Sequence, residues 1–202
     1  MNLILNIITA LIIIFFTCIF FLSRIFVPNL GFRRSRLPRE LPKEFENAII
    51  KIKKQSKDKE DFAKKIYYYL TKKFHGEPGR VWNDFPFLFV KNVNKLWSRT
   101  LLHCHQLNYL YRIALVKSKL FYEKDIKIIH GFFMFNIHQY LEINIGRLKE
   151  KWVKVDLFAK TLGFKFGQTL PKFFNVFKYW KKRKTSFFSF FSIISHIFRR
   201  IF

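Results

Sequence analysis

The stretch that decides the fold runs from Thr100 to Ala159 and reads TLLHCHQLNYLYRIALVKSKLFYEKDIKIIHGFFMFNIHQYLEINIGRLKEKWVKVDLFA. Apolar residues recur in it at the spacing of one helix face, at Leu107, Leu110, Tyr111, Ala114 and Leu115. Cys104 lies three residues before this pattern. We therefore predict that Cys104 stands in the first turn of a helix, on its inward face.

A helix start suits a nucleophilic thiol. The first backbone N–H groups of a helix have no intrahelical acceptor, and the helix dipole there favours negative charge. Because the thiolate is the reactive form of cysteine, this position lowers the cost of forming the nucleophile. Cys104 is the candidate nucleophile of the chain.

Two later runs alternate apolar and polar residues with the period of a β-strand. The first covers 137–145 and carries His138 on its polar face, and the second covers 152–157 and carries Asp156 on its polar face. Each run has one mainly apolar face. We predict two strands that form an antiparallel hairpin.

The register of this hairpin follows from matching the two faces. A turn around 146–148, centred on Arg147, pairs Leu141 with Val153 and sets His138 opposite Asp156. Directly opposed β-carbons lie ~5 Å apart, which allows an imidazole–carboxylate hydrogen bond. A slip of one residue would send one partner to the wrong face.

This ordered set resembles the transglutaminase-like superfamily, which shares the papain-like fold. The matching parts are spread over about a third of the 202 residues. They are Cys104 at a helix start, the run 138–143 that begins with the histidine, the run Trp152-Val153-Lys154-Val155-Asp156, and Gly131, which matches the glycine that usually ends the strand before the histidine. The sequence has Leu102 where the family usually has glycine and Tyr140 where it usually has tryptophan. The resemblance implies an α+β core, a cysteine helix packed on an antiparallel sheet, over residues 44–168.

The chemistry expected of such a site is acyl transfer. His138 takes the proton of Cys104, Asp156 fixes the imidazole tautomer, and the thiolate attacks an amide carbonyl to give a thioester. The backbone N–H of Cys104 supplies one oxyanion donor. We expect a peptide or protein substrate, no cofactor, and hydrolysis rather than transamidation, although the sequence does not identify the acyl acceptor.

Other interpretations of the same residues stay open. The domain would be a catalytically inactive scaffold if its cleft only binds peptides. A metal site built from Cys104, His130, His138 and Asp156 is chemically possible, but the sequence has no close-spaced ligand pair. The remaining polar neighbours are interpreted as incidental: His103 and His105 as helix-start residues, although they would raise the local positive potential, and Asn136 and Gln139 as solvated strand-edge residues.

The composition points to anionic partners. The net charge is +25, and half of the residues are hydrophobic, 28 of them phenylalanine. Such charge favours membrane lipid or nucleic acid, although an AT-rich genome produces a similar bias towards lysine. The two cysteines, Cys18 in an apolar run and Cys104 in the domain, are not expected to form a structural disulfide.

The N-terminus is predicted to attach the chain to a membrane. Leu3 to Leu22 carries no charge, and a helix of that length spans ~30 Å, so residues 1–24 are interpreted as an uncleaved transmembrane anchor. The arginines after it place the domain on the cytoplasmic side by the positive-inside rule. Residues 25–43 are interpreted as a basic juxtamembrane linker, either solvated or touching anionic headgroups.

The flanking segments complete the prediction. A helix is expected over 44–54, and a second one, capped by Asp58 with Asp61 in its first turn, ends near His75. Trp82 and Trp97 are interpreted as core residues rather than walls of a cleft. The basic aromatic tail, 169–202, is interpreted as a membrane-interfacial segment or a helix packed on the domain, and a nucleic-acid patch is the third option.

Overall fold

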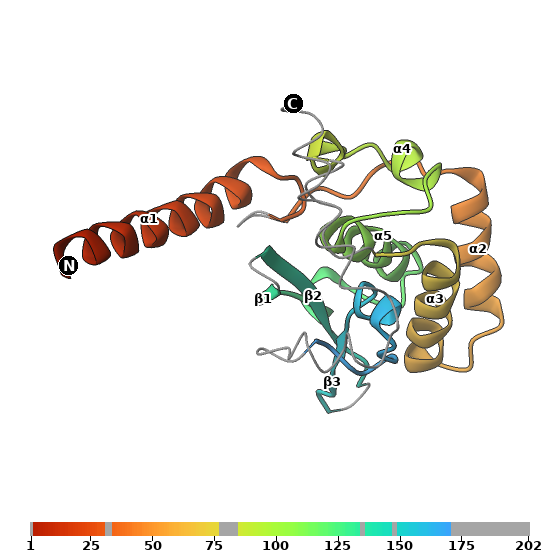
Figure 1. Cartoon of the computed structure of the whole chain (residues 1–202). Coiled ribbons are helices and arrows are strands. Elements are labelled where there is room, and N and C mark those ends of the chain that lie inside the picture. Colours follow the sequence, from red (N-terminus) through yellow and green to blue (C-terminus); the bar gives the residue numbers. More distant parts are fainter. Residues whose placement is uncertain (1, 31–33, 77–84, 134–135, 147–148, 171–202) are drawn as a thin grey trace.

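The computed structural model describes residues 2–30, 34–76, 85–133, 136–146 and 149–170 (Figure 1). The fold is α+β, with a three-stranded antiparallel sheet in the order β1-β2-β3 and helices packed against it. The helices are α1 (Asn2–Phe26), α2 (Lys43–Lys54), α3 (Lys59–Lys73), α4 (Val93–Trp97) and α5 (Cys104–Lys117), and the strands are β1 (Ile126–Phe133), β2 (Asn136–Asn144) and β3 (Trp152–Val155). Short 3-10 turns occupy Phe85–Phe89, Glu123–Asp125 and Ala159–Leu162.

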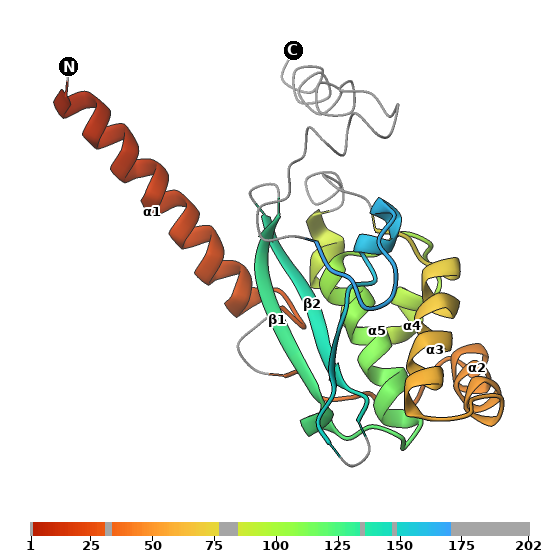
Figure 2. The ribbon, with the colours of Figure 1, turned by 90° about the horizontal axis from the view of Figure 1, so that it is seen from below.

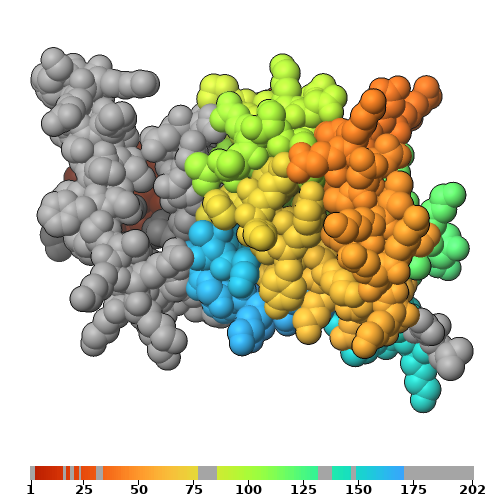
Figure 3. Space-filling view, turned by 90° about the vertical axis from the view of Figure 1, so that its right-hand side faces the viewer, coloured from red at the N-terminus to blue at the C-terminus, as the bar shows by residue number. Residues whose placement is uncertain are grey.

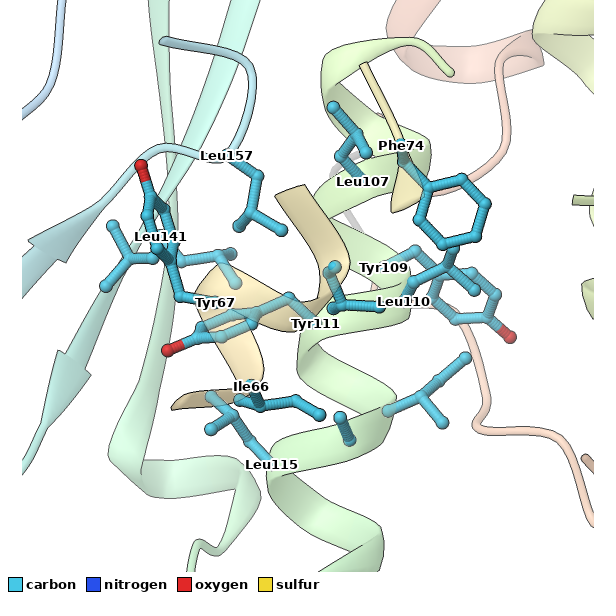
Figure 4. Close-up of a cluster of buried hydrophobic side chains, with 14 of the residues drawn as sticks. Ile66, Tyr67, Phe74, Leu107, Tyr109, Leu110, Tyr111, Leu115, Leu141 and Leu157 are labelled. Carbon is cyan, nitrogen blue, oxygen red and sulfur yellow. The ribbon is translucent and has the colours of Figure 1, made fainter. Parts of the chain in front are cut away.

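Helix α5 is the centre of the domain. It packs against β2 on one side and α3 on another, so most of its residues are buried, including all five of the predicted apolar positions. Figure 4 shows Ile66 and Tyr67 of α3 meeting Leu110 and Tyr111 of α5 beside Leu141 of β2. Burying such side chains fully contributes ~2–3 kcal/mol each. The helix that begins at the candidate nucleophile is therefore fixed by the core.

The leading helices form as the sequence predicts. Asp58 caps α3, its Oδ1 accepting the backbone N–H of Asp61 at 2.8 Å. Figure 3 shows α2 and α3 side by side over one face, with the blue segment that follows β3 next to α3. Trp97 stacks on Phe45 of α2 with ring centroids 4.3 Å apart and is 7% exposed, so its interpretation as a core residue is confirmed. Trp82 lies outside the described residues.

The register of β2 against β3 differs from the predicted one. Leu141 pairs with Val155 rather than with Val153, a shift of two residues. An even shift keeps every side chain on its predicted face of the sheet. Because β3 ends at Val155, Asp156 follows the strand, and it reaches His138 as a diagonal neighbour rather than a directly opposed one.

The side chain of Asn144 accounts for this shift. Its Oδ1 accepts hydrogen bonds from the backbone N–H groups of Gly146 and Lys151, both at 3.0 Å. The backbone N–H of Ile145 also donates to the Lys151 oxygen at 2.9 Å. Asparagine side chains close loops in this way. Strand pairing therefore starts at Asn144 and Trp152, and the connection is longer than the alternation of residues indicated.

The strand before the histidine is also longer than the resemblance implied. β1 begins at Ile126 but continues through Gly131 to Phe133. Gly131 is paired directly with His138 instead of ending its strand, and the next pair is His130 with Gln139. Because neighbouring residues of a strand point to opposite faces, His130 and His138 lie on opposite faces of the sheet.

Residues 34–43, which we call the strap, run along α5 rather than into solvent. The guanidinium of Arg34 donates to the backbone oxygens of Glu123 and Ile126. Side chains of α5 in turn donate to strap carbonyls: Arg112 to Ser35 at 3.0 Å, Tyr109 to Arg36 at 3.1 Å and Lys117 to Arg39 at 3.1 Å. For this part of the predicted linker, the interpretation as a solvated spacer is wrong.

Helix α1 projects away from the domain, as Figure 2 shows from below. Its apolar side chains face outward, from Leu3 at 72% exposed to Phe26 at 64%. The chain then returns to the domain at Val27 and Leu30, which pack with Leu88. Within the described residues, no helix is both long enough and apolar enough to cross a membrane. The predicted tail lies outside the described residues from position 171 on.

Candidate active site

Cys104 is the first residue of α5, and a buried glutamine fixes that helix start. The backbone N–H of His103, the residue before the helix, donates to Oε1 of Gln106 at 3.1 Å. Nε2 of the same glutamine donates to the backbone oxygen of Phe87 at 2.8 Å. Gln106 is fully buried. It therefore holds the nucleophile-bearing turn against the 3-10 turn that ends at Phe89.

The segment before Cys104 is tied to the end of α3. The backbone N–H of Leu102 donates to the oxygen of His75 at 3.0 Å, and the N–H of His75 donates to Thr100 at 2.8 Å. Leu102 is 3% exposed and belongs to the core. At this position, where the sequence resemblance led us to expect glycine, the leucine side chain is thus used for packing, and the backbone is held by a parallel bridge between His75 and Leu101.

His138 and Asp156 form a buried pair. Nε2 of His138 lies 2.7 Å from Oδ2 of Asp156, with the two side chains 7% and 0% exposed. Oδ1 of Asp156 accepts the backbone N–H of Ala159 at 3.0 Å, and Oδ2 also lies 3.5 Å from the N–H of Leu170. The Phe158 ring packs 5.6 Å from the imidazole. The carboxylate is thus held from several directions and fixes the imidazole.

The charges of the site shift the pKa values of both His138 and Cys104. Burial lowers the pKa of His138, but the charge and hydrogen bond of Asp156, with a further contribution from Cys104, outweigh it and raise the pKa to about 10. Burial raises the pKa of Cys104, but hydrogen bonds and charge from His105 and His138 outweigh it and lower the pKa to about 6. At neutral pH the site therefore holds a thiolate and an imidazolium.

This arrangement has the elements of a thiol nucleophile. Because Nε2 of His138 is bonded to Asp156, the other ring nitrogen, Nδ1, is the one available to the Cys104 side chain, with which His138 is hydrogen-bonded. The N–H of Cys104 is one of the amides at a helix start that have no intrahelical acceptor, so it is available to stabilise an oxyanion. The structure brings all three sequence-predicted site residues together.

His130 does not belong to this cluster. It lies on the opposite face of the sheet, where Nε2 of Gln139 approaches its Nε2 at 3.2 Å. Burial, with the nearby charge of Arg24, lowers its pKa to about 4 despite the hydrogen bond that the ring donates to the backbone of Leu30. Among the described residues, no three His, Cys, Asp or Glu side chains are grouped so as to hold a metal ion, and the metal alternative that included His130 is therefore wrong.

Gln139 is a structural residue rather than a solvated one. It is 1% exposed, its Nε2 donates to the backbone oxygen of Asn29 at 2.7 Å, and its own backbone oxygen accepts Nδ2 of Asn108 at 2.6 Å. Beside it is a cavity of about 10 Å³, lined also by His105 and Arg112. This is room for about one water molecule, not for an organic cofactor.

Sequence reasoning missed four contributors to the site. Gln106 was overlooked, although a glutamine three residues after a helix cap is a known signature of a capping side chain. His105, interpreted as incidental, is 2% exposed, and its Nε2 lies 3.2 Å from the Leu88 oxygen. The amides of Ala159 and Leu170 carry no sequence signal, because any residue supplies a backbone N–H.

Comparison of the chain with family models, with curated proteins and with solved structures found no match. The functional interpretation therefore depends on the geometry of the site and on the sequence pattern around it.

Proposed function

We propose that this chain is a thiol enzyme of the transglutaminase-like kind, with a papain-like core, acting on peptide or protein amides. What supports the proposal most strongly is the buried pair formed by His138 and Asp156, whose bonded atoms lie 2.7 Å apart, beside a cysteine whose pKa is lowered to about 6. A buried charged pair costs desolvation energy and is weak evidence of a stabilising role. Its placement next to a helix-start thiol gives it a chemical use instead.

The reaction follows from the protonation states. The Cys104 thiolate attacks the amide carbon, and the oxyanion lies by the N–H of Cys104. The His138 imidazolium gives its proton to the departing nitrogen as the carbon–nitrogen bond breaks, which leaves a thioester. The neutral imidazole then takes a proton from water as its oxygen attacks the thioester. Cleavage of the carbon–sulfur bond releases a carboxylic acid and restores the thiolate and the imidazolium.

Hydrolysis is the favoured outcome, and transamidation follows if an amine replaces water. The test is to incubate the purified full-length chain with a mixture of proteome-derived peptides, with and without a labelled primary amine. New peptide termini in the mass spectrum support hydrolysis, and incorporated amine supports transamidation. Cys104→Ala is the control. If the wild-type chain and this variant give identical spectra under all conditions, the non-catalytic scaffold is the better account.

Membrane attachment through α1 is part of the proposal. A row of apolar side chains exposed on a helix that projects from the domain indicates contact with a membrane or a partner, because monomeric soluble proteins rarely expose such patches. The form of attachment to be tested is the one predicted from the sequence, a single membrane span with the domain on the cytoplasmic side. Extraction of membranes with alkaline carbonate leaves a spanning chain in the pellet and releases an interfacial one. Recovery of the untreated chain in the soluble fraction would contradict attachment of either kind.

A further inference from the structure

His105 is a second imidazole at the nucleophile, supplied by the helix itself. It follows Cys104 directly, in the first turn of α5, and its side chain is hydrogen-bonded to the Cys104 side chain. Its ring is nearly parallel to that of His103, at 3° and 5.8 Å between centroids. At 2% exposure it has little contact with solvent. The thiol is thus approached by two imidazoles, one from α5 and one from β2.

The Leu88 oxygen fixes the tautomer of His105. This carbonyl lies 3.2 Å from Nε2, and a carbonyl only accepts hydrogen bonds, so Nε2 carries a proton. In the neutral ring Nδ1 is therefore an acceptor, suited to the thiol. In the imidazolium Nδ1 is a donor, suited to the thiolate. Both bonds of His105 are kept when one proton moves from sulfur to Nδ1.

His138, in contrast, is already paired with a carboxylate. Its Nε2 bonds to Asp156 at 2.7 Å, and the pair is enclosed. A histidine held as an imidazolium in this way carries a proton on Nδ1 as well as on Nε2, so it donates to Cys104 and serves as an acid but cannot accept the thiol proton. The two histidines therefore divide the proton transfers between them.

We infer that His105 is a second base of this site, taking the Cys104 proton on Nδ1 while His138 remains the acid that protonates the leaving nitrogen. The S–H bond breaks, the Nδ1–H bond forms, and two ion pairs result: Cys104 with His105, and His138 with Asp156. This inference rests on the proposed function. The other titratable groups near His105 are His103, stacked on it, and Tyr109 and Arg112, which line the cavity that its ring borders.

Two substitutions test the roles of the two ring nitrogens of His105 separately. In His105→Gln the side-chain amide takes the place of Nε2 and still donates to Leu88, but nothing replaces Nδ1. In His105→Asn the amide takes the place of Nδ1, next to the sulfur, and the Leu88 bond is lost. A background of Cys18→Ser leaves Cys104 as the single thiol. His75→Gln, at an exposed histidine, is the matched control.

The measurement is the rate of iodoacetamide alkylation of Cys104 in the full-length chain as a function of pH, with a thermal melt of each variant. We expect His105→Gln to reduce the rate at pH 6 about fivefold, because a rise of one unit in the midpoint of thiolate formation does so. His105→Asn should reduce the rate as far, because its amide can hydrogen-bond to the sulfur in the place of Nδ1 but cannot take up a proton. His75→Gln should stay within twofold of the parent.

Two results would overturn the inference: no change in His105→Gln, or a rate retained in His105→Asn, which would mean that a hydrogen bond in the place of Nδ1, and not a base, supports the thiolate. A parallel His138→Ala variant tells this failure from that of the proposed function. If His138→Ala is slowed and His105→Gln is not, only the second base is wrong. If neither is slowed, the proposed function falls as well.

Discussion

The two faces of the sheet carry two histidines with opposite electrostatics, His138 on β2 and His130 on β1. On one face His138 meets the Asp156 carboxylate, and its pKa is raised to about 10. On the other face His130 meets the amide of Gln139 and the charge of Arg24, and its pKa is lowered to about 4. Burial acts against the charged form of both rings. The presence of an enclosed carboxylate, not burial, therefore decides which histidine carries charge at neutral pH.

The largest effect should come from removing the charged histidine. In His138→Ala, Cys104 loses a hydrogen bond and a positive charge, so its pKa returns towards the ordinary value of about 8.5. The thiolate fraction at pH 7 then falls from most of the protein to a few per cent. We expect about a 30-fold drop in the iodoacetamide alkylation rate at pH 7, measured in the Cys18→Ser background. A rate within threefold of the parent would mean that His138 does not lower the pKa of Cys104.

The next effect concerns the carboxylate that distinguishes the two faces. Asp156→Asn keeps the shape of the side chain but removes its charge, so the pKa of His138 should fall towards that of a buried neutral imidazole. We expect about a tenfold drop in alkylation at pH 7 and a loss of ~2 kcal/mol in the free energy of unfolding, measured by urea denaturation. Asp61→Asn, at an exposed helix start, is the control for reactivity. An undiminished rate in Asp156→Asn would show that the carboxylate does not hold the imidazolium.

The strap gives an intermediate effect, on stability alone. Arg112 is 5% exposed and bonds to both carboxylate oxygens of Glu123, at 2.9 and 2.8 Å, and to the strap at Ser35. Arg112→Met should cost ~2 kcal/mol of unfolding free energy, because it leaves these acceptors without their donor. Lys117→Met, which removes one exposed bond to the strap, should change it by less than ~0.5 kcal/mol. Equal losses in the two variants would indicate that the strap is not held at Arg112.

The smallest effect should come from the uncharged histidine. In His130→Gln the side-chain oxygen can still accept from Gln139, and the residue is on the face away from Cys104. Alkylation of Cys104 at pH 7 should stay within twofold of the parent, and the unfolding free energy should change by less than ~1 kcal/mol. A loss comparable to that of His138→Ala would mean that the two faces are not independent.

Much of the site could be predicted from the local periodicity of the sequence. The 3.6-residue period predicted the helix that begins at Cys104, and the two-residue period predicted the faces of His138 and Asp156. The predicted register was wrong by two residues, because the register depends on how the Asn144 side chain bonds to the ends of the loop. A shift by an even number of residues leaves the faces unchanged, and for that reason the pairing of His138 with Asp156 survived the error.

What the sequence could not provide are contacts with backbone atoms far along the chain. Gln106 reaches the carbonyl of Phe87, and His105 reaches that of Leu88. The strap likewise offers only its carbonyls to α5. Every residue has a carbonyl, so no residue type marks these positions, and they become visible only when the chain has folded.

The charged pair on one face of the sheet should hold Cys104 as a thiolate at neutral pH. The pH profile of Cys104 alkylation tests this most directly. It uses the full-length chain with Cys18→Ser and iodoacetamide, between pH 4.5 and 10. We predict a rate that rises with a midpoint near pH 6, where the pKa of Cys104 lies. A single rise centred near pH 8.5 to 9, as for an ordinary thiol, would contradict this prediction.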